Sequence, residues 1–108
     1  MERSSQELSY RSVLGWGNRG WLEIIDLILS VCEHGALKTH VMYKCNLNSK
    51  QVQQYLDFVV SRNLVKGTRD ADDPRRTIYV TTETGRKFMV AYNELAEMFS
   101  LKTNGLDV

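Results

Sequence analysis

The sequence predicts an α+β domain with a three-helix core, a β-hairpin and a long last helix. Apolar residues recur at three- and four-residue spacing in separate stretches, which is the period of amphipathic helices. Two runs of β-favouring residues flank a cluster of turn-forming residues, a pattern typical of a hairpin. A chain of 108 residues with 43% hydrophobic and 25% charged residues also has the size and balance of one globular domain.

The first helix is expected over residues 21–33, and Gly35 would end it. Its apolar stripe consists of Trp21, Ile24, Ile25, Ile28, Val31 and Cys32. A short second helix is expected over residues 39–45, with Thr39 as its N-cap. The inward face of this second helix would be made of Val41, Met42 and Cys45.

A third helix is expected over residues 49–62, after a tight turn and with Asn48 or Ser49 as its cap. Its inner face is apolar and consists of Val52, Tyr55, Leu56, Val59 and Val60. Its outer face is polar and consists of Lys50, Gln51, Gln53, Gln54, Asp57 and Ser61. Two helices joined by so short a turn indicate a helix-turn-helix, whose second helix can enter the major groove of DNA.

The hairpin follows directly, with strands expected over residues 64–69 and 76–81. A hairpin in this place is a wing, so the predicted fold is a winged helix-turn-helix. The turn between the strands carries three carboxylates that phosphates would repel: Asp70, Asp72 and Asp73. Either Arg75 and Arg76 pair with these carboxylates, or the tip of the wing points away from DNA.

The last helix is expected to begin at Thr82 or Thr84 and to end near Leu101. Large residues recur along it at heptad-like spacing: Phe88, Tyr92, Leu95 and Phe99. So dense an apolar seam is more than one small core can cover, and we expect it to join two copies of the chain as a homodimer. Packing of part of the seam on the first helix of the same chain is the alternative.

These elements divide the chain into four parts. Residues 1–19 are polar and show no sustained period, so they are expected to form a flexible arm with a few apolar residues that could dock: Leu8, Tyr10, Val13, Leu14 and Trp16. Residues 20–82 would form the winged domain, residues 83–101 the dimerisation helix and residues 102–108 a tail.

Charge is uneven along the chain, although the formal net charge is only +1. Residues 38–76 contain eight Lys and Arg against four Asp, a net charge of +4. A basic middle third favours a polyanionic partner, because Lys and Arg neutralise phosphates and Gln can pair with adenine through two hydrogen bonds. The candidate DNA-contacting residues lie in this part of the chain: Lys38, Lys44, Ser49, Lys50, Gln51, Gln53, Gln54, Arg69, Arg75 and Arg76.

Several short motifs, taken together, resemble one family. The pattern K-T-x-x-M-Y-K-x-x-L begins at Lys38, a Tyr-Leu pair follows at Tyr55, and T-x-x-G begins at Thr82. The set is similar to the small chromatin-associated winged-helix proteins of hyperthermophilic archaea and their transcription-regulator relatives, over about residues 20–100. The resemblance implies double-stranded DNA binding by the third helix and an antiparallel coiled coil between two last helices. A shorter last helix, a near-neutral charge and an acidic wing tip depart from the family pattern and favour a site-selective regulator over a protein that coats DNA.

The same residues are compatible with other functions. A winged helix can also act as a protein–protein adaptor without direct DNA binding, which the near-neutral charge and the aromatic residues Trp16, Trp21 and Phe58 favour. A general chromatin-associated DNA binder is a further alternative. Zinc chemistry would suit Cys32, His34, His40 and Cys45, yet both cysteines lie on predicted inner faces, so we expect no metal.

No catalytic motif is evident, and we therefore expect neither enzymatic activity nor a cofactor. No apolar run reaches the length of a membrane span, and no signal peptide is visible. Two cysteines suit a reducing compartment. These observations predict a cytoplasmic, nucleoid-associated protein.

Overall fold

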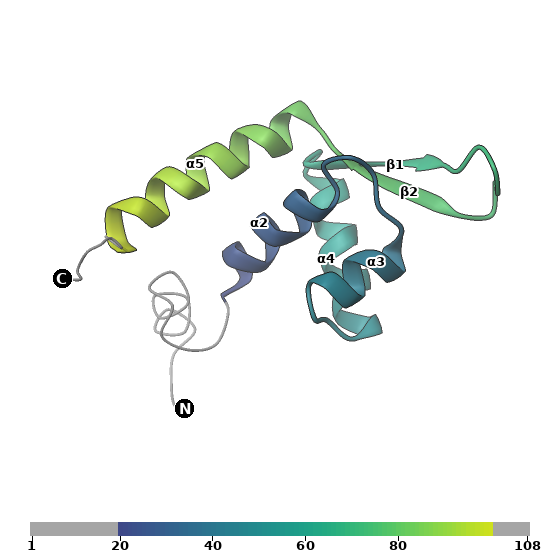
Figure 1. Ribbon diagram of the computed structural model, residues 1–108, viewed down its shortest axis with the longest axis horizontal. Coiled ribbons are helices and arrows are strands. Elements are labelled where there is room, and N and C mark those ends of the chain that lie inside the picture. The colour runs from purple at the N-terminus through teal and green to yellow at the C-terminus, as the bar shows by residue number, and fades with distance from the viewer. Residues whose placement is uncertain (1–19, 101–108) are drawn as a thin grey trace.

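The computed structural model of the protein describes residues 20–100, so the expected arm and tail lie outside the described part. The elements follow in the order α2 (Trp21–Val31), α3 (Lys38–Lys44), α4 (Ser49–Ser61), β1 (Val65–Arg69), β2 (Thr77–Thr81) and α5 (Glu83–Ser100) (Figure 1). All the elements expected in this range are present, with boundaries that differ by no more than two residues from the expected ones. The winged helix-turn-helix fold is thereby confirmed, with a hairpin that projects from the three-helix core and α5 beside α2 (Figure 1).

The core forms where the inner faces of α2, α3 and α4 meet. Its fully buried side chains are Ile25, Ile28, Leu29, Cys32, Val41, Cys45, Val52, Leu56, Val59 and Val65. Two residues expected on inner faces are instead exposed, Trp21 by 52% and Val60 by 41%. Trp21 occupies the first turn of α2, and Val60 lies at the edge of α4 that faces the wing, so neither is covered by a third element.

The start of α3 is set by the sheet rather than by a capping side chain. The N-cap is Leu37, which offers no side-chain hydrogen bond, so the prediction of Thr39 as N-cap is wrong. Just before it, Ala36 forms a β-bridge with Tyr79. The backbone nitrogen of Ala36 lies 3.0 Å from the carbonyl oxygen of Tyr79, and the nitrogen of Tyr79 lies 2.8 Å from the carbonyl oxygen of Ala36. This bridge fixes the direction of the chain as it enters α3.

The wing is anchored in the core at its base. β1 and β2 pair antiparallel, with Val65 opposite Thr81 and Arg69 opposite Thr77. Val65 and Thr81 are buried, and the Thr81 hydroxyl donates to the carbonyl oxygen of Leu29 at 2.6 Å. Beyond Val65 the residues of β1 are exposed, so the hairpin projects away from the helices (Figure 1).

The first turn of α5 is held tightly against the end of α4. Thr82, one of the two expected caps, accepts a hydrogen bond from the Gly85 N–H at 3.0 Å. Its hydroxyl donates to the carbonyl oxygen of Asn63 at 2.7 Å. A Cβ at Gly85 would clash with the carbonyl oxygen of Leu64 and lie 2.7 Å from Cγ2 of Thr81. The T-x-x-G motif therefore combines a helix cap with a close backbone approach.

A Gly85→Ala substitution is expected to destabilise the fold by about 1–3 kcal/mol, the usual cost of forcing extra volume into a packed site. The added methyl group meets backbone that the Thr82 hydrogen bonds hold in place. The free energy of unfolding in urea measures the effect. Thr84→Ala, at an exposed position of the same turn, is the control and should change stability by less than about 0.5 kcal/mol. Equal stabilities of the two variants would contradict the close approach.

The two cysteines belong to the core. Cys32 and Cys45 are completely buried, and burial, together with the neighbouring Cys45, raises the pKa of the Cys32 thiol to about 12. Within residues 20–100, no group of three or more His, Cys, Asp or Glu side chains is arranged to hold a metal ion. In the same part of the chain, no helix has both the length and the apolar character needed to cross a bilayer.

Buried thiols of this kind should be inert in the native protein, because the thiolate is the reactive form. We expect neither thiol to react with Ellman's reagent at pH 8 over minutes. Both thiols of each chain should react at once after unfolding in guanidinium chloride, which serves as the internal control. Rapid modification of the folded protein would show that the core opens far more readily than its packing indicates.

Candidate nucleic-acid interface

A tight turn joins α3 to α4 and sets the angle between them. Asn46 adopts a left-handed conformation with φ of 56°, which asparagine tolerates better than most residues. Leu47 follows and is buried, and its N–H donates to the carbonyl oxygen of Met42 at 2.9 Å. Leu47 therefore ties the turn to α3 through both its buried side chain and its backbone N–H.

The outer face of α4 is open to solvent in the described part of the chain. Every polar residue expected on this face is exposed: Lys50, Gln51, Gln53, Gln54, Asp57 and Ser61. Ser49, in the first position of the helix, is exposed as well. The first turn of α4 carries no acidic residue, so nothing there opposes an anion at the positive end of the helix dipole.

The Gln51 side chain contributes to the start of α4. Asn48 is the N-cap, and its side-chain oxygen accepts from the Gln51 N–H at 2.7 Å. The Gln51 side-chain oxygen accepts from the Asn48 N–H at 3.0 Å, which completes a capping box. Its carbonyl group is thus engaged, and only its amide NH2 group remains to contact a ligand.

Gln53 links α3 to α4. Its Oε1 accepts from Nζ of Lys38 at 2.5 Å, and its Nε2 donates to Oδ1 of Asp57 at 2.8 Å. Lys38 is half-buried by this arrangement. Of the expected polar contact residues on α4, Ser49, Lys50 and Gln54 therefore present the side chains least engaged elsewhere among the described residues.

Exposed residues of α3 extend this surface. Lys44, an expected contact, is exposed, and so are His40 and Tyr43 at spacings that place all three on one side of the helix. Tyr43 is 77% exposed, and its hydroxyl can donate to a phosphate oxygen. His40 and Tyr43 are not among the contacts expected from the sequence, although the inward placement of Val41 and Cys45 implies that they point outward.

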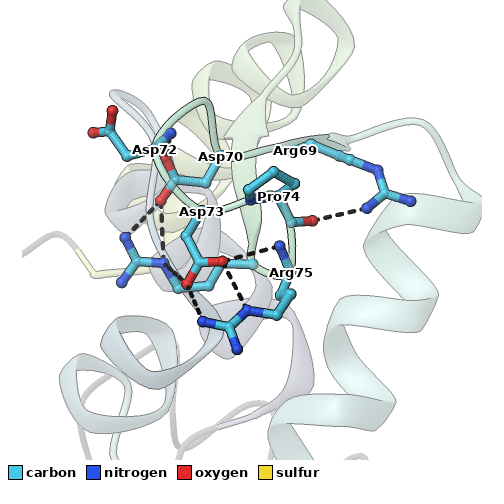
Figure 2. A network of polar contacts seen from close by, with 7 residues as sticks. Arg69, Asp70, Asp72, Asp73, Pro74 and Arg75 are labelled. Atoms are coloured by element: carbon cyan, nitrogen blue, oxygen red, sulfur yellow. Dashed lines mark hydrogen bonds and ion pairs between the residues drawn. The ribbon is translucent and has the colours of Figure 1, made fainter.

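The wing tip neutralises its own charges (Figure 2). Nη2 and Nε of Arg76 donate to Asp70 at 2.6 and 3.1 Å, and Nε of Arg75 donates to Asp73 at 3.0 Å. Nη1 of Arg69 donates to the carbonyl oxygen of Pro74 at 2.8 Å. Of the two possibilities for this turn, the arginine–carboxylate pairing is therefore the one found.

The same contacts account for the acidity of the wing carboxylates. The N–H of Asp72 and the side chain of Arg76 hold the pKa of Asp70 below its ordinary value. Hydrogen bonds from the side chain and the N–H of Arg75 lower the pKa of Asp73. Because both pairs lie at the surface, they add little to stability. They do reduce the positive charge that the three arginines can offer to a phosphate.

A groove of about 380 Å3 separates the second half of α4 from the wing. Asp57 lines it, and Tyr79 faces it from β2. Burial, and then the charge of Asp57, raises the pKa of the Tyr79 hydroxyl. A carboxylate in this position disfavours a phosphate between α4 and the wing, so the N-terminal half of α4 is the end better suited to a nucleic acid.

The expected dimerisation seam on α5 divides into two halves. Phe88 and Tyr92 stack with ring centroids 6.3 Å apart and are half-buried. Burial, followed by the nearby carboxylates Glu23 and Asp26 of α2, raises the pKa of Tyr92. Leu95 and Phe99 instead remain 41% and 49% exposed, and Met98 beside them is 75% exposed. The first half of the seam thus packs within the chain, whereas the second half stays open.

Comparison with known proteins agrees with this geometry. A family model described as winged helix-turn-helix matches residues 18–100. Sso10a-2, a DNA-binding protein from Sulfolobus solfataricus, is 31% identical, with a TM-score of 0.66 over 74% of this chain and 81% of that chain. An uncharacterised protein of Methanocaldococcus jannaschii is 29% identical over 85 residues, which are 78% of this chain and 80% of the relative. The transcriptional regulator BldR from Sulfolobus solfataricus shares the fold at 18% identity, with a TM-score of 0.71 over 95% of this chain and 72% of that chain.

Proposed function

The chain belongs to the winged helix-turn-helix family, and from this premise we propose that it binds double-stranded DNA as a homodimer and regulates transcription at selected sites. The observation that carries the proposal is the open N-terminal half of α4, with Lys50 and Gln54 exposed and no carboxylate in its first turn. The DNA-binding description of Sso10a-2, at 31% identity, supports the same partner. A DNA-binding protein of this kind would associate with the nucleoid.

In this proposal the N-terminal half of α4 enters the major groove. Gln54 can pair with an adenine through two hydrogen bonds, and Lys50 can reach a guanine or a phosphate. Tyr43 and Lys44 of α3, with Ser49 at the helix start, would contact the phosphate backbone. The hydrogen bonds from Lys38 to Gln53 and from Gln53 to Asp57 connect α3 to α4. Phosphate contacts made by α3 would therefore also orient α4, whose side chains contact the bases.

Charge supports selective over general binding. The formal net charge is +1, and the arginines of the wing tip are engaged with carboxylates or a carbonyl group within the wing. With three arginines and three aspartates, the wing tip adds no net charge to neutralise phosphates, and each neutralised phosphate adds about 0.9 to the slope of log affinity against log salt. Such a surface gains little affinity from phosphates alone and depends more on base contacts.

The exposed half of α5 supports the homodimer. Leu95 and Phe99 lie in the C-terminal half of α5 and are exposed. The C-terminal end of α5 extends beyond α2 (Figure 1). Antiparallel pairing of two such helices would bury both side chains against their counterparts. A twofold dimer would also present two α4 helices to successive major grooves, about 34 Å apart on one face of the duplex.

A gel-shift experiment tests this function against its alternatives. The full chain is titrated into a random duplex and into a duplex pool enriched by repeated selection, each at two salt concentrations. We expect the enriched pool to bind at least about tenfold more tightly than the random duplex at the higher salt. Equal affinity for both would indicate a general chromatin-associated binder, and no binding to either would indicate a protein–protein adaptor.

A further inference from the structure

An apolar groove lies between the start of α2 and the middle of α4, and Gln54 of the proposed DNA-contacting surface is one of the residues that line it. Its volume is about 300 Å3, and it is lined by Trp21, Ile25, Gln54, Tyr55 and Phe58. Trp21 and Phe58 meet edge to face, with ring centroids 6.2 Å apart and ring planes at 85°. These two rings form aromatic walls, and Trp21 remains 52% exposed although it is one of the largest apolar side chains in the chain.

The Phe58 wall is held in place by a second contact. The guanidinium carbon of Arg62 lies 5.3 Å from the centroid of the Phe58 ring, a cation–π arrangement. Phe58 also packs against the core. A groove with one wall fixed by the core and the other on the first turn of a helix is suited to hold a large apolar side chain.

The part of the chain that precedes α2 would need no long connection to reach this groove. Trp21 is the first residue of α2, so the residues before it join the domain at the groove itself. Four residues separate Trp16 from Trp21. At about 3.3–3.6 Å per residue, the five steps between these two residues span up to about 18 Å. Gly17 and Gly20 lie within this connection, and glycine adopts the backbone conformations that a reversal of direction requires.

We propose that residues 10–16 fold back onto the groove between α2 and α4, with the Trp16 indole against Trp21 and Phe58. The segment carries the apolar residues that such a site requires: Tyr10, Val13, Leu14 and Trp16. A tethered segment has an effective concentration in the millimolar range, which favours it over a second copy or a separate ligand at ordinary protein concentrations. The groove is thus a docking site for the N-terminal segment of its own chain. Because Gln54 also lines the groove, a docked segment would lie beside the proposed DNA-contacting surface.

A double-mutant cycle in the full chain tests the contact. Trp16→Ala should lower the urea midpoint in the parent protein but have at most half this effect in a Phe58→Leu background, because the partner ring is gone. Phe58→Leu keeps an apolar side chain against the core, so the fold should survive. The control cycle pairs Trp16→Ala with Val60→Ala, an exposed position on another side of α4, and should be additive. Additivity in the Phe58 cycle would overturn the proposal.

Nuclear Overhauser contacts in a mixture of isotope-labelled and unlabelled full chains identify the occupant. Contacts between the Trp16 indole and the Phe58 ring within one chain are the expected result. The same contacts between chains would mean that a second copy fills the groove, and their absence would mean that residues 10–16 do not dock there. Either of these results would overturn the proposal.

Discussion

A Lys50→Glu variant should bind duplex DNA about tenfold to a hundredfold more weakly than the parent protein. Lys50 is exposed at the start of α4, where no carboxylate opposes an approaching phosphate or guanine. Loss of one good base or phosphate contact costs about 1–3 kcal/mol, and every 1.4 kcal/mol is a factor of ten in affinity. The variant should also reduce the slope of log affinity against log salt by about 0.9, because one fewer phosphate is neutralised.

A matched control separates this local effect from a change in total charge. Lys87→Glu makes the same charge change at an exposed position on α5, outside the α3–α4 surface. It should alter affinity by less than about threefold, because salt screens an exposed charge that does not contact the duplex. Fluorescence anisotropy of a labelled duplex at several salt concentrations provides both quantities. Equal losses for the two variants would mean that Lys50 acts only through net charge.

A Leu95→Asp variant should be a monomer of 12.5 kDa, whereas the parent protein should have twice this mass. Leu95 lies in the open half of the α5 seam, and a dimer would bury it. An unpaired carboxylate at such a contact carries a desolvation penalty of several kcal/mol, roughly what a small helical interface can supply. Light scattering coupled to size-exclusion chromatography measures the mass.

The monomer should also lose DNA affinity, because two linked modules bind with an avidity about a hundredfold or more above that of one. Val90→Asp is the control for this variant. Val90 is 58% exposed and lies on the side of α5 opposite the seam, so its replacement should leave the dimer intact. A parent protein that is already monomeric, or a Leu95→Asp variant that still dimerises, would rule out the seam as the interface.

The fold could be predicted almost completely from the sequence, for a simple physical reason. Helical periodicity, turn residues and β-favouring runs each report on local structure, and here they agree with the tertiary packing. Thr82 and Asn48 were both identified as possible helix caps, and both form the expected hydrogen bonds. The start of α3 was missed, because a β-bridge between Ala36 and Tyr79 sets it and no local pattern reports such a contact.

The candidate surface could be predicted in location but not in detail. Spacing placed Gln51, Gln53 and Gln54 on the outer face of α4, and all three are exposed. Residue spacing does not show which side-chain amide is already hydrogen-bonded within the protein. The structure shows that Gln51 takes part in a capping box and that Gln53 is hydrogen-bonded to Lys38 and Asp57. The roles proposed for these residues in DNA binding remain predictions.

The wing illustrates the same limit. Three aspartates and three arginines within eight residues allow either a charged tip or a neutralised one. The turn geometry decides between them, because it brings Asp70 to Arg76 and Asp73 to Arg75. The choice depends on side-chain distances of a few ångströms, which composition and order along the chain do not specify.

The most direct test of DNA entry by the N-terminal half of α4 is a titration of the isotope-labelled full chain with a selected duplex, followed by amide chemical shifts. The largest changes should fall on residues 43–54, from the exposed end of α3 to Gln54, while residues 70–76 of the wing tip change little. Shifts confined to the wing tip, or to the groove residues Trp21, Ile25, Tyr55 and Phe58, would contradict this placement of the duplex.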